Sequence, residues 1–138
     1  LDLEGTLISN AVSQIPRPHL ASFLNEAEKL GRLVLYTSVS HSRTVEIQRL
    51  LVSEGAAPSW FIELESLHPE GTVKPIQVAQ AHSPECLHYW LVDDQVRCIK
   101  AGEGDWWIQV KEFMPPYDVN DSELRRVAAV LKDKVSQV

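Results

Sequence analysis

Two carboxylates, two positions apart, open the sequence. The chain begins Leu1-Asp-Leu-Glu-Gly-Thr6, an alternation of apolar and acidic residues that runs into Gly-Thr. Residues two apart in an extended chain point to the same side, so we expect Asp2 and Glu4 to face one crevice just beyond a buried strand. Two acids placed in this way can divide the chemistry, because one can attack as a nucleophile while the other moves a proton.

Further polar residues stand where later strands are expected to end. Thr37 closes the second predicted strand, Lys74 follows the third after a loop, and Asp93 and Asp94 close the fourth. Open α/β sheets bind ligands outside the carboxyl ends of their strands, so these residues are candidates for one site with the two N-terminal acids. Each also has an ordinary structural interpretation: a threonine that caps a turn, a lysine in solvent, and an acidic turn.

The apolar pattern predicts the elements that hold these residues. Helical spacing predicts helices over residues 19–30, from 40 or 41 to Gly55, 76–81 and 122–135. Apolar runs bounded by turn residues predict a first strand that ends at Leu1 and four further strands over residues 32–36, 60–64, 89–92 and 106–110. The apolar side of the second helix is expected to consist of Val45, Ile47, Leu50, Leu51 and Val52. A capping box is predicted at the last helix from Asn120 and Glu123.

Alternating strands and helices predict an α/β fold with a doubly wound parallel sheet. A chain of 138 residues is expected to form one domain, residues 1–138. Because a strand usually needs about five residues, we expect most of the first strand to precede Leu1. Core elements fill the stretches from Asp2 to Thr37 and from Thr37 to Lys74, so no cap domain is expected over the site.

Composition narrows the class of partner. The formal net charge of −6 argues against direct binding of nucleic acid, which needs a basic face, but leaves room for a phosphorylated substrate or a protein partner. No apolar run approaches the roughly 20 residues of a membrane span, so no membrane association is expected. Cys86 and Cys98 match no zinc or redox spacing, and two reduced thiols predict a cytoplasmic location.

The segment Asp2-Leu-Glu-Gly-Thr6 resembles motif I of the haloacid dehalogenase (HAD) superfamily of phosphotransferases, whose usual form is Asp-x-Asp-x-Thr/Val. Enolase-phosphatase-like members carry a similar Asp-x-Glu-Gly-Thr. The order acid, Thr, Lys, Asp-Asp along the chain resembles motifs I to IV. The resemblance implies a three-layer, Rossmann-like fold with strand order 5-4-1-2-3. A receiver domain is disfavoured, because there the lysine comes after the phosphoacceptor aspartate and late in the chain.

The same resemblance implies a role for each site residue. Asp2 would take the phosphoryl group as an acyl phosphate, and Glu4 would serve as general acid/base. Thr37 would donate a hydrogen bond to a phosphate oxygen, and Lys74 would pair with the phosphate and with Asp2. The implied cofactor is Mg²⁺, a cation that prefers oxygen ligands. Its ligands would come from Asp2, the Glu4 backbone carbonyl, and a carboxylate of Asp93 or Asp94.

Within the superfamily, the segment Leu33-Val-Leu-Tyr-Thr-Ser38 resembles the NLI-interacting-factor-like branch, which includes the RNA polymerase C-terminal-domain phosphatases. That branch usually shows Val-Leu-Phe-Thr-Ala-Ser. This chain departs from the branch twice, with Glu-Gly in motif I where the branch has Asp-Glu, and Asp-Asp in motif IV where it commonly has Asp-Asn. The departures argue against a eukaryotic polymerase tail as substrate.

We therefore expect an uncapped Mg²⁺-dependent phosphatase acting on a phosphate monoester, on either a small molecule or a protein. The crevice would be open to a protein partner, with only the loop over residues 7–18 able to act as a flap. Two alternatives remain. One is a catalytically silent HAD-like module that docks a protein, and the other is a phosphotransferase with an acceptor other than water.

Overall fold

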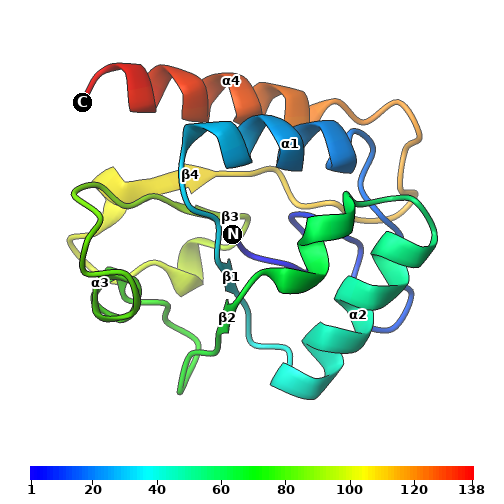
Figure 1. Cartoon of the computed structure of the whole chain (residues 1–138), viewed down its shortest axis with the longest axis horizontal. Helices are drawn as coiled ribbons and strands as arrows, with labels where there is room; N and C mark the ends of the chain where they lie inside the picture. Colours follow the sequence, from blue (N-terminus) through cyan, green and yellow to red (C-terminus); the bar gives the residue numbers. More distant parts are fainter.

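The helices at the two ends of the chain follow the predicted periodicity. Helix α1 spans Leu20–Leu30 and buries Leu20, Phe23, Leu24 and Ala27. Helix α4 spans Glu123–Ser136 and buries Leu124, Val127, Ala128 and Leu131. The computed structural model describes all 138 residues and shows α1 and α4 side by side along one side of the strands (Figure 1). Their apolar faces meet in the main hydrophobic core.

Helix α2 spans His41–Ser53, and its start is capped by Ser40, whose hydroxyl accepts a hydrogen bond from the Arg43 amide. Gly55, at φ +74°, follows its end in the left-handed conformation that glycine tolerates. The buried residues of α2 are Thr44, Ile47, Gln48 and Leu51. Val45, Leu50 and Val52, the other residues of the predicted apolar side, are half-buried, and Val52 packs against the core. The Gln48 side chain also lies on the inner face, where its amide donates to the carbonyls of Phe61 and Leu64.

The strands are short and pair in parallel. Strand β1 (Leu35–Tyr36) pairs with β2 (Ser66–Leu67), and β3 (Leu91–Asp93) pairs with β4 (Trp107–Gln109). Leu1 and Asp2 lie between the two pairs: the Tyr36 amide donates to the Leu1 carbonyl, and the Asp2 amide donates to the Val92 carbonyl. The fold is α/β with small parallel sheets. The five-strand order and three-layer arrangement remain predictions.

The strand predicted over residues 60–64 is wrong. Residues Ser59–Glu63 form the 3₁₀ helix η1, which begins after Pro58, and the strand comes later as β2. With three residues per turn, Phe61 and Leu64 fall on the same side, where Phe61 is fully buried and Leu64 packs against the core. Ile62 points outward and is 49% exposed. The run of apolar residues indicated burial, but its period was that of a tight helix.

The second half of the chain contains helix α3 (Ile76–His82) and the 3₁₀ helices η2 (Val96–Cys98) and η3 (Gly104–Trp106). The capping box predicted from Asn120 and Glu123 is wrong. Ser122 is the N-cap residue of α4 and makes no side-chain cap. The Glu123 carboxylate instead accepts from the Lys111 amide and from Arg126, while the Glu123 amide donates to Asp121 Oδ1.

The interior contains a cluster of 21 buried apolar residues, but four charged side chains are buried as well. These are Asp2, Arg17, Lys74 and Asp93. Charged residues are almost never fully buried unless they are paired, so the partners of these four side chains show where a functional site can lie.

Candidate active site

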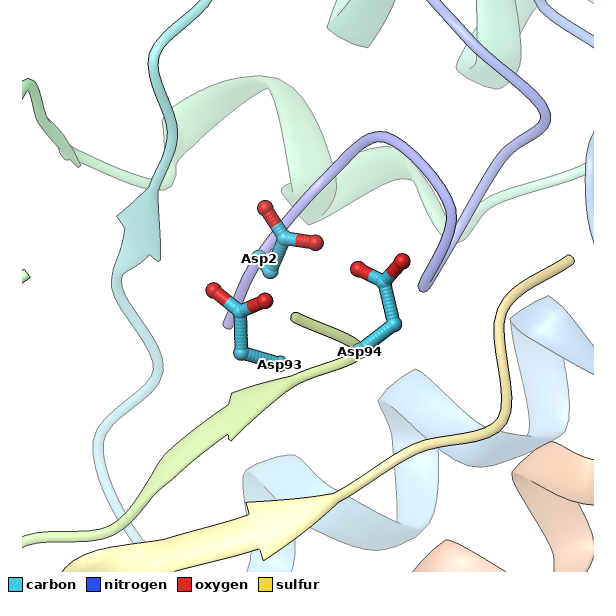
Figure 2. A group of neighbouring side chains, drawn as sticks. All are labelled: Asp2, Asp93 and Asp94. Atoms are coloured by element: carbon cyan, nitrogen blue, oxygen red, sulfur yellow. The ribbon is translucent and has the colours of Figure 1, made fainter. Parts of the chain in front are cut away.

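Three carboxylates meet where the N-terminal segment passes the end of β3. Asp2 comes from the N-terminal segment, Asp93 is the last residue of β3, and Asp94 follows it. One carboxylate oxygen from each of the three lies within 4.8 Å of the others. Figure 2 shows the three carboxyl groups gathered on one side of the ribbon. The structure thus brings together the acids that the sequence placed after the first and fourth strands.

Lys74 lies between two of these carboxylates. Its Nζ donates to Asp2 Oδ1 at 2.7 Å and to Asp93 Oδ2 at 2.6 Å, and its side chain is only 3% exposed. The backbone fixes the approach, because the Lys74 amide donates to the Cys98 carbonyl just before α3 begins. The alternative of a lysine in solvent is therefore wrong. An ammonium group this deeply buried requires its anionic partners.

The two acids of the Asp93-Asp94 pair differ in environment. Asp93 is fully buried, and both of its oxygens are engaged, Oδ2 by Lys74 and Oδ1 by the Gln95 amide. Asp94 is half-buried and accepts from Thr6 Oγ1 and from Gln95 Nε2. Asp93 therefore orients the lysine and closes the turn, whereas Asp94 keeps contact with solvent at the edge of the cluster.

Thr6 is a site residue that the sequence prediction did not single out, although it closes the Asp-x-Glu-Gly-Thr segment. Its Oγ1 lies 2.9 Å from Asp2 Oδ2 and 3.1 Å from Asp94 Oδ1, and the residue is fully buried. One hydroxyl has a single proton to donate, so Thr6 can make a full hydrogen bond to only one of the two carboxylates at a time. It ties the two carboxylates to the same loop.

Thr37 directly follows β1 and is buried, and its side chain is not hydrogen-bonded to the three carboxylates. Its Oγ1 accepts from the Val39 amide at 3.1 Å, which is the turn-capping contact that the structural interpretation predicts. The Thr37 carbonyl accepts from His68 Nδ1 at 3.1 Å. Because an accepting hydroxyl keeps its proton, this contact leaves Thr37 able to donate.

Glu4 is not part of the cluster either. Its Oε2 accepts from the Ala11 amide at 2.7 Å, within the loop that was expected to act as a flap. The Ala11 carbonyl in turn accepts from Arg43 of α2, also at 2.7 Å. Two charged side chains thus hold Ala11 from both sides. The Glu4 carboxylate is thus held by the loop and not by the other acids, and a crevice shared by Asp2 and Glu4 stays a prediction.

Arg17 was also missed, since nothing in the spacing of Pro-Arg-Pro indicated a buried cation. Its guanidinium is paired with Asp121 through two hydrogen bonds of 2.9 and 3.1 Å, and it lies over the Phe113 ring. The same group donates to the carbonyls of Gly5 and Thr6. Arg17 therefore ties the loop that carries Asp2 and Thr6 to the start of α4.

Arg17→Met is expected to lower the free energy of unfolding by about 3–5 kcal/mol, because it leaves Asp121 unpaired and two loop carbonyls without donors. Urea denaturation followed by circular dichroism measures this change. Arg125→Met is the matched control, since Arg125 is exposed on α4 and should change stability by no more than about 0.5 kcal/mol. Equal effects of the two substitutions would contradict the assigned role of Arg17.

The buried charges of the cluster act on the pKa values of Asp2 and Lys74. Burial raises the pKa of Asp2 to about 8 against the pull of Lys74, and the neighbouring Asp93 adds to the rise. Burial alone would lower the pKa of Lys74, but the Asp2 and Asp93 carboxylates raise it. A cluster with this charge balance holds a proton on Asp2 near neutral pH, unless another cation takes its place.

This raised pKa predicts a pH dependence of stability in metal-free buffer. Between an unfolded pKa of 3.8 and a folded pKa of about 8, the folded protein retains a proton that the unfolded chain has released. Stability therefore falls as pH rises through that window, by up to about 1.4 kcal/mol per pH unit from this group. Asp2→Asn removes the titration, so the stability of wild type should fall relative to Asp2→Asn in urea titrations with EDTA. Parallel curves for the two proteins would contradict the prediction.

Two sizeable cavities are lined by residues other than the three clustered aspartates. One of about 500 Å³ is lined by acidic and apolar residues around Arg32 and Trp60, and one of about 440 Å³ is mainly apolar and borders Leu1, α3 and the end of α4. Neither is lined by Asp2, Asp93 or Asp94. The second cavity nevertheless reaches Leu1 and Val92, the residues directly before Asp2 and Asp93.

The fold and site define an α/β protein in which acids and a lysine converge at the carboxyl ends of parallel strands. The chain belongs to the NLI interacting factor-like phosphatase family, whose model matches residues 1–138. This match confirms the resemblance to that branch of the HAD superfamily and supports a phosphatase function. No curated protein matches the chain. None of the helices is long and apolar enough to cross a membrane.

Proposed function

We propose that the protein is an Mg²⁺-dependent phosphatase that hydrolyses a phosphate monoester through an aspartyl-phosphate on Asp2. The observation that carries the proposal is the position of Lys74, buried between Asp2 and Asp93 at 2.7 and 2.6 Å. A lysine in this position orients one carboxylate oxygen of Asp2 and supplies a positive charge beside it. Phosphoryl transfer depends mainly on such positioning and charge neutralisation.

The donor set fits a hard divalent cation. Asp2, Asp93 and Asp94 bring three carboxylates within 4.8 Å, and Lys74 is the only cation bonded to them. Carboxylate oxygens are the ligands that Mg²⁺ prefers, and like charges this close repel one another without a counter-ion. Asp2, Asp94 and the Glu4 carbonyl would hold the ion, with Asp93 behind Lys74. When bound, Mg²⁺ would screen the Asp2 carboxylate from the phosphate oxygens.

Unpartnered amides support an anion site beside Asp2. The N–H groups of Leu3 and Glu4 donate to no acceptor in the protein, although Leu3 is fully buried. Buried amides are nearly always hydrogen-bonded, so a phosphoryl oxygen is a natural acceptor for them. Thr37 and Lys74 would bind the other phosphoryl oxygens.

The proposed reaction has two steps. In the first, an Asp2 carboxylate oxygen attacks phosphorus, the bond from phosphorus to the ester oxygen breaks, and Glu4 gives a proton to the leaving oxygen. In the second, water attacks the acyl phosphate, Glu4 takes its proton, and the bond from phosphorus to Asp2 breaks to release inorganic phosphate. The Ala11 amide is bonded to Glu4 Oε2, so Oε1 would carry the proton in both steps.

The substrate class follows from the elements around the site. Only α2, η1, β2 and a loop separate Thr37 from Lys74, so we propose a crevice without a cap domain. Such a crevice would admit a phosphate on a protein or on the end of a larger ligand, and a partner chain could cover it. We place the enzyme in the cytoplasm, which suits two cysteines that are both free thiols.

A catalytically silent module that docks a protein is the second candidate, and the Glu4–Ala11 contact is the observation that favours it, because the Glu4 carboxylate is bonded to the loop and is not among the three clustered acids. A phosphotransferase would share the first step and differ only in the acceptor. The test is release of inorganic phosphate from p-nitrophenyl phosphate and from phosphopeptides, with millimolar Mg²⁺ or with EDTA. The enzyme proposal requires Mg²⁺-dependent release. No release from any ester with Mg²⁺ present favours the docking module.

A further inference from the structure

Gly5 is the only one of the six glycines whose Cβ position is occupied by atoms of another residue. It lies at φ +76°, and a Cβ built on it would be 2.5 Å from Asp94 Oδ2 and 3.0 Å from Asp94 Cγ. The other five glycines have nothing within 4 Å of the same position. The Asp94 carboxylate therefore occupies the space where any other residue at position 5 would place its side chain.

Hydrogen bonds hold both the backbone of Gly5 and the carboxylate of Asp94. The Gly5 amide donates to the Ile8 carbonyl at 2.8 Å, and the Gly5 carbonyl accepts from the Phe113 amide at 2.8 Å and from Arg17. On the other side, Asp94 is held by Thr6 Oγ1 and by Gln95 Nε2. A Cβ at position 5 would have to be accommodated by displacing the Asp94 carboxylate, since the backbone of Gly5 is fixed at both its polar groups.

We infer that Gly5 is a positioning residue for Asp94: its lack of a side chain allows the Asp94 carboxylate to reach the divalent-cation site that it would share with Asp2 and the Glu4 carbonyl. The inference rests on the metal site of the proposed function.

The charge balance gives this contact a consequence. With Asp94 in place, three carboxylates face a single lysine, which leaves an excess of negative charge for a divalent cation to neutralise. Moving Asp94 away removes one oxygen ligand and part of that charge. Groups that orient the ligands of a metal typically change its affinity by about 10–100-fold when they are altered, and we expect Gly5 to act on this scale.

The chain supplies a control for the backbone effect. Gly55 has almost the same conformation, at φ +74°, but nothing lies near its Cβ position. Alanine at either position suffers the strain of a left-handed backbone, whereas only Gly5→Ala also collides with Asp94. The difference between the two variants isolates the contact.

The test measures Mn²⁺ binding by electron paramagnetic resonance, and Mg²⁺ binding by competition, in wild type, Gly5→Ala and Gly55→Ala. We expect Gly55→Ala to bind Mn²⁺ as wild type does, and Gly5→Ala to bind it about 10–100-fold more weakly. Equal binding by the two variants overturns the inference and leaves the proposed phosphatase intact. Wild type that binds neither ion overturns both the metal site and the inference.

A double variant keeps the test valid if Gly5→Ala folds poorly. Gly5→Ala/Asp94→Ala removes the colliding carboxylate, so its melting temperature should exceed that of Gly5→Ala, while Mn²⁺ binding stays weak as in Asp94→Ala. A double variant no more stable than Gly5→Ala would show that the strain does not come from Asp94, and would overturn the inference.

Discussion

Asp2→Asn is expected to lower phosphatase activity by at least about 10⁴-fold, because it removes the nucleophile of the proposed reaction. Asparagine has the shape of aspartate, so its carbonyl oxygen can still accept from Lys74 or Thr6. Lys74 also keeps its contact with Asp93. The fold should therefore survive, and the burial that raises the pKa of Asp2 makes a neutral side chain acceptable at this position.

The measurement is steady-state hydrolysis of p-nitrophenyl phosphate with saturating Mg²⁺, together with the circular dichroism spectrum of each protein. Asp105→Asn is the matched control, because Asp105 is an exposed acid on η3, outside the carboxylate cluster, and its loss should leave the rate unchanged. Hydrolysis by pure Asp2→Asn at the wild-type rate would exclude Asp2 as the nucleophile.

Glu4→Gln is expected to have the second largest effect, a fall of about 10²–10⁴-fold in steady-state turnover, which is the usual contribution of a general acid/base. The substitution is well matched to the structure, since the glutamine carbonyl can keep the hydrogen bond from the Ala11 amide. Any loss then reports the proton shuttle and not a rearranged loop.

The kinetic pattern of Glu4→Gln is specific. The p-nitrophenolate leaving group needs little protonation, so transfer of the phosphoryl group to Asp2 should continue while hydrolysis of the acyl phosphate stalls. Rapid-mixing experiments should show a burst of p-nitrophenolate followed by a slow phase. Glu26→Gln, an exposed acid on α1, should behave as wild type. Turnover of Glu4→Gln at the wild-type rate would remove Glu4 from the mechanism and leave it as the contact that holds Ala11.

Helices were the most predictable part of the fold. The observed α1, α2, α3 and α4 begin and end within one residue of the predicted ranges or, for the end of α2, at the residues leading to Gly55. Apolar residues at helical spacing and a serine N-cap carry this information locally. Strands were less predictable, because the shortest of them have two residues and are defined by partners elsewhere in the chain.

Burial by tertiary partners explains the errors. The segment 60–64 was predicted as a strand because it is apolar, but Pro58 and the position of Phe61 favour the 3₁₀ helix η1. Gln48 is buried because two carbonyls of the segment around η1 need a donor. The pattern of apolar residues along the chain shows neither the 3₁₀ helix nor the burial of Gln48.

The candidate site also has one part that the sequence predicted and one part that it did not. The order of acid, lysine and paired acids at strand ends predicted the cluster of Asp2, Lys74, Asp93 and Asp94, because parallel strands bring their carboxyl ends together. The roles of Thr6 and Arg17 depend on side-chain contacts across the fold, including a pair between Arg17 and Asp121 that are 104 positions apart. The attachment of Glu4 to Ala11 likewise depends on how the loop folds back.

The most direct test of the account is the location of the phosphoryl group on the protein. Glu4→Gln is mixed with p-nitrophenyl phosphate and Mg²⁺, quenched in acid within the burst, and examined by intact-mass spectrometry and peptide mapping. The account predicts one added phosphoryl group on the N-terminal peptide, carried by Asp2, removed by hydroxylamine and absent from Asp2→Asn/Glu4→Gln. A phosphoryl group on another residue, or an unmodified protein that still releases p-nitrophenolate, would contradict the aspartyl-phosphate mechanism.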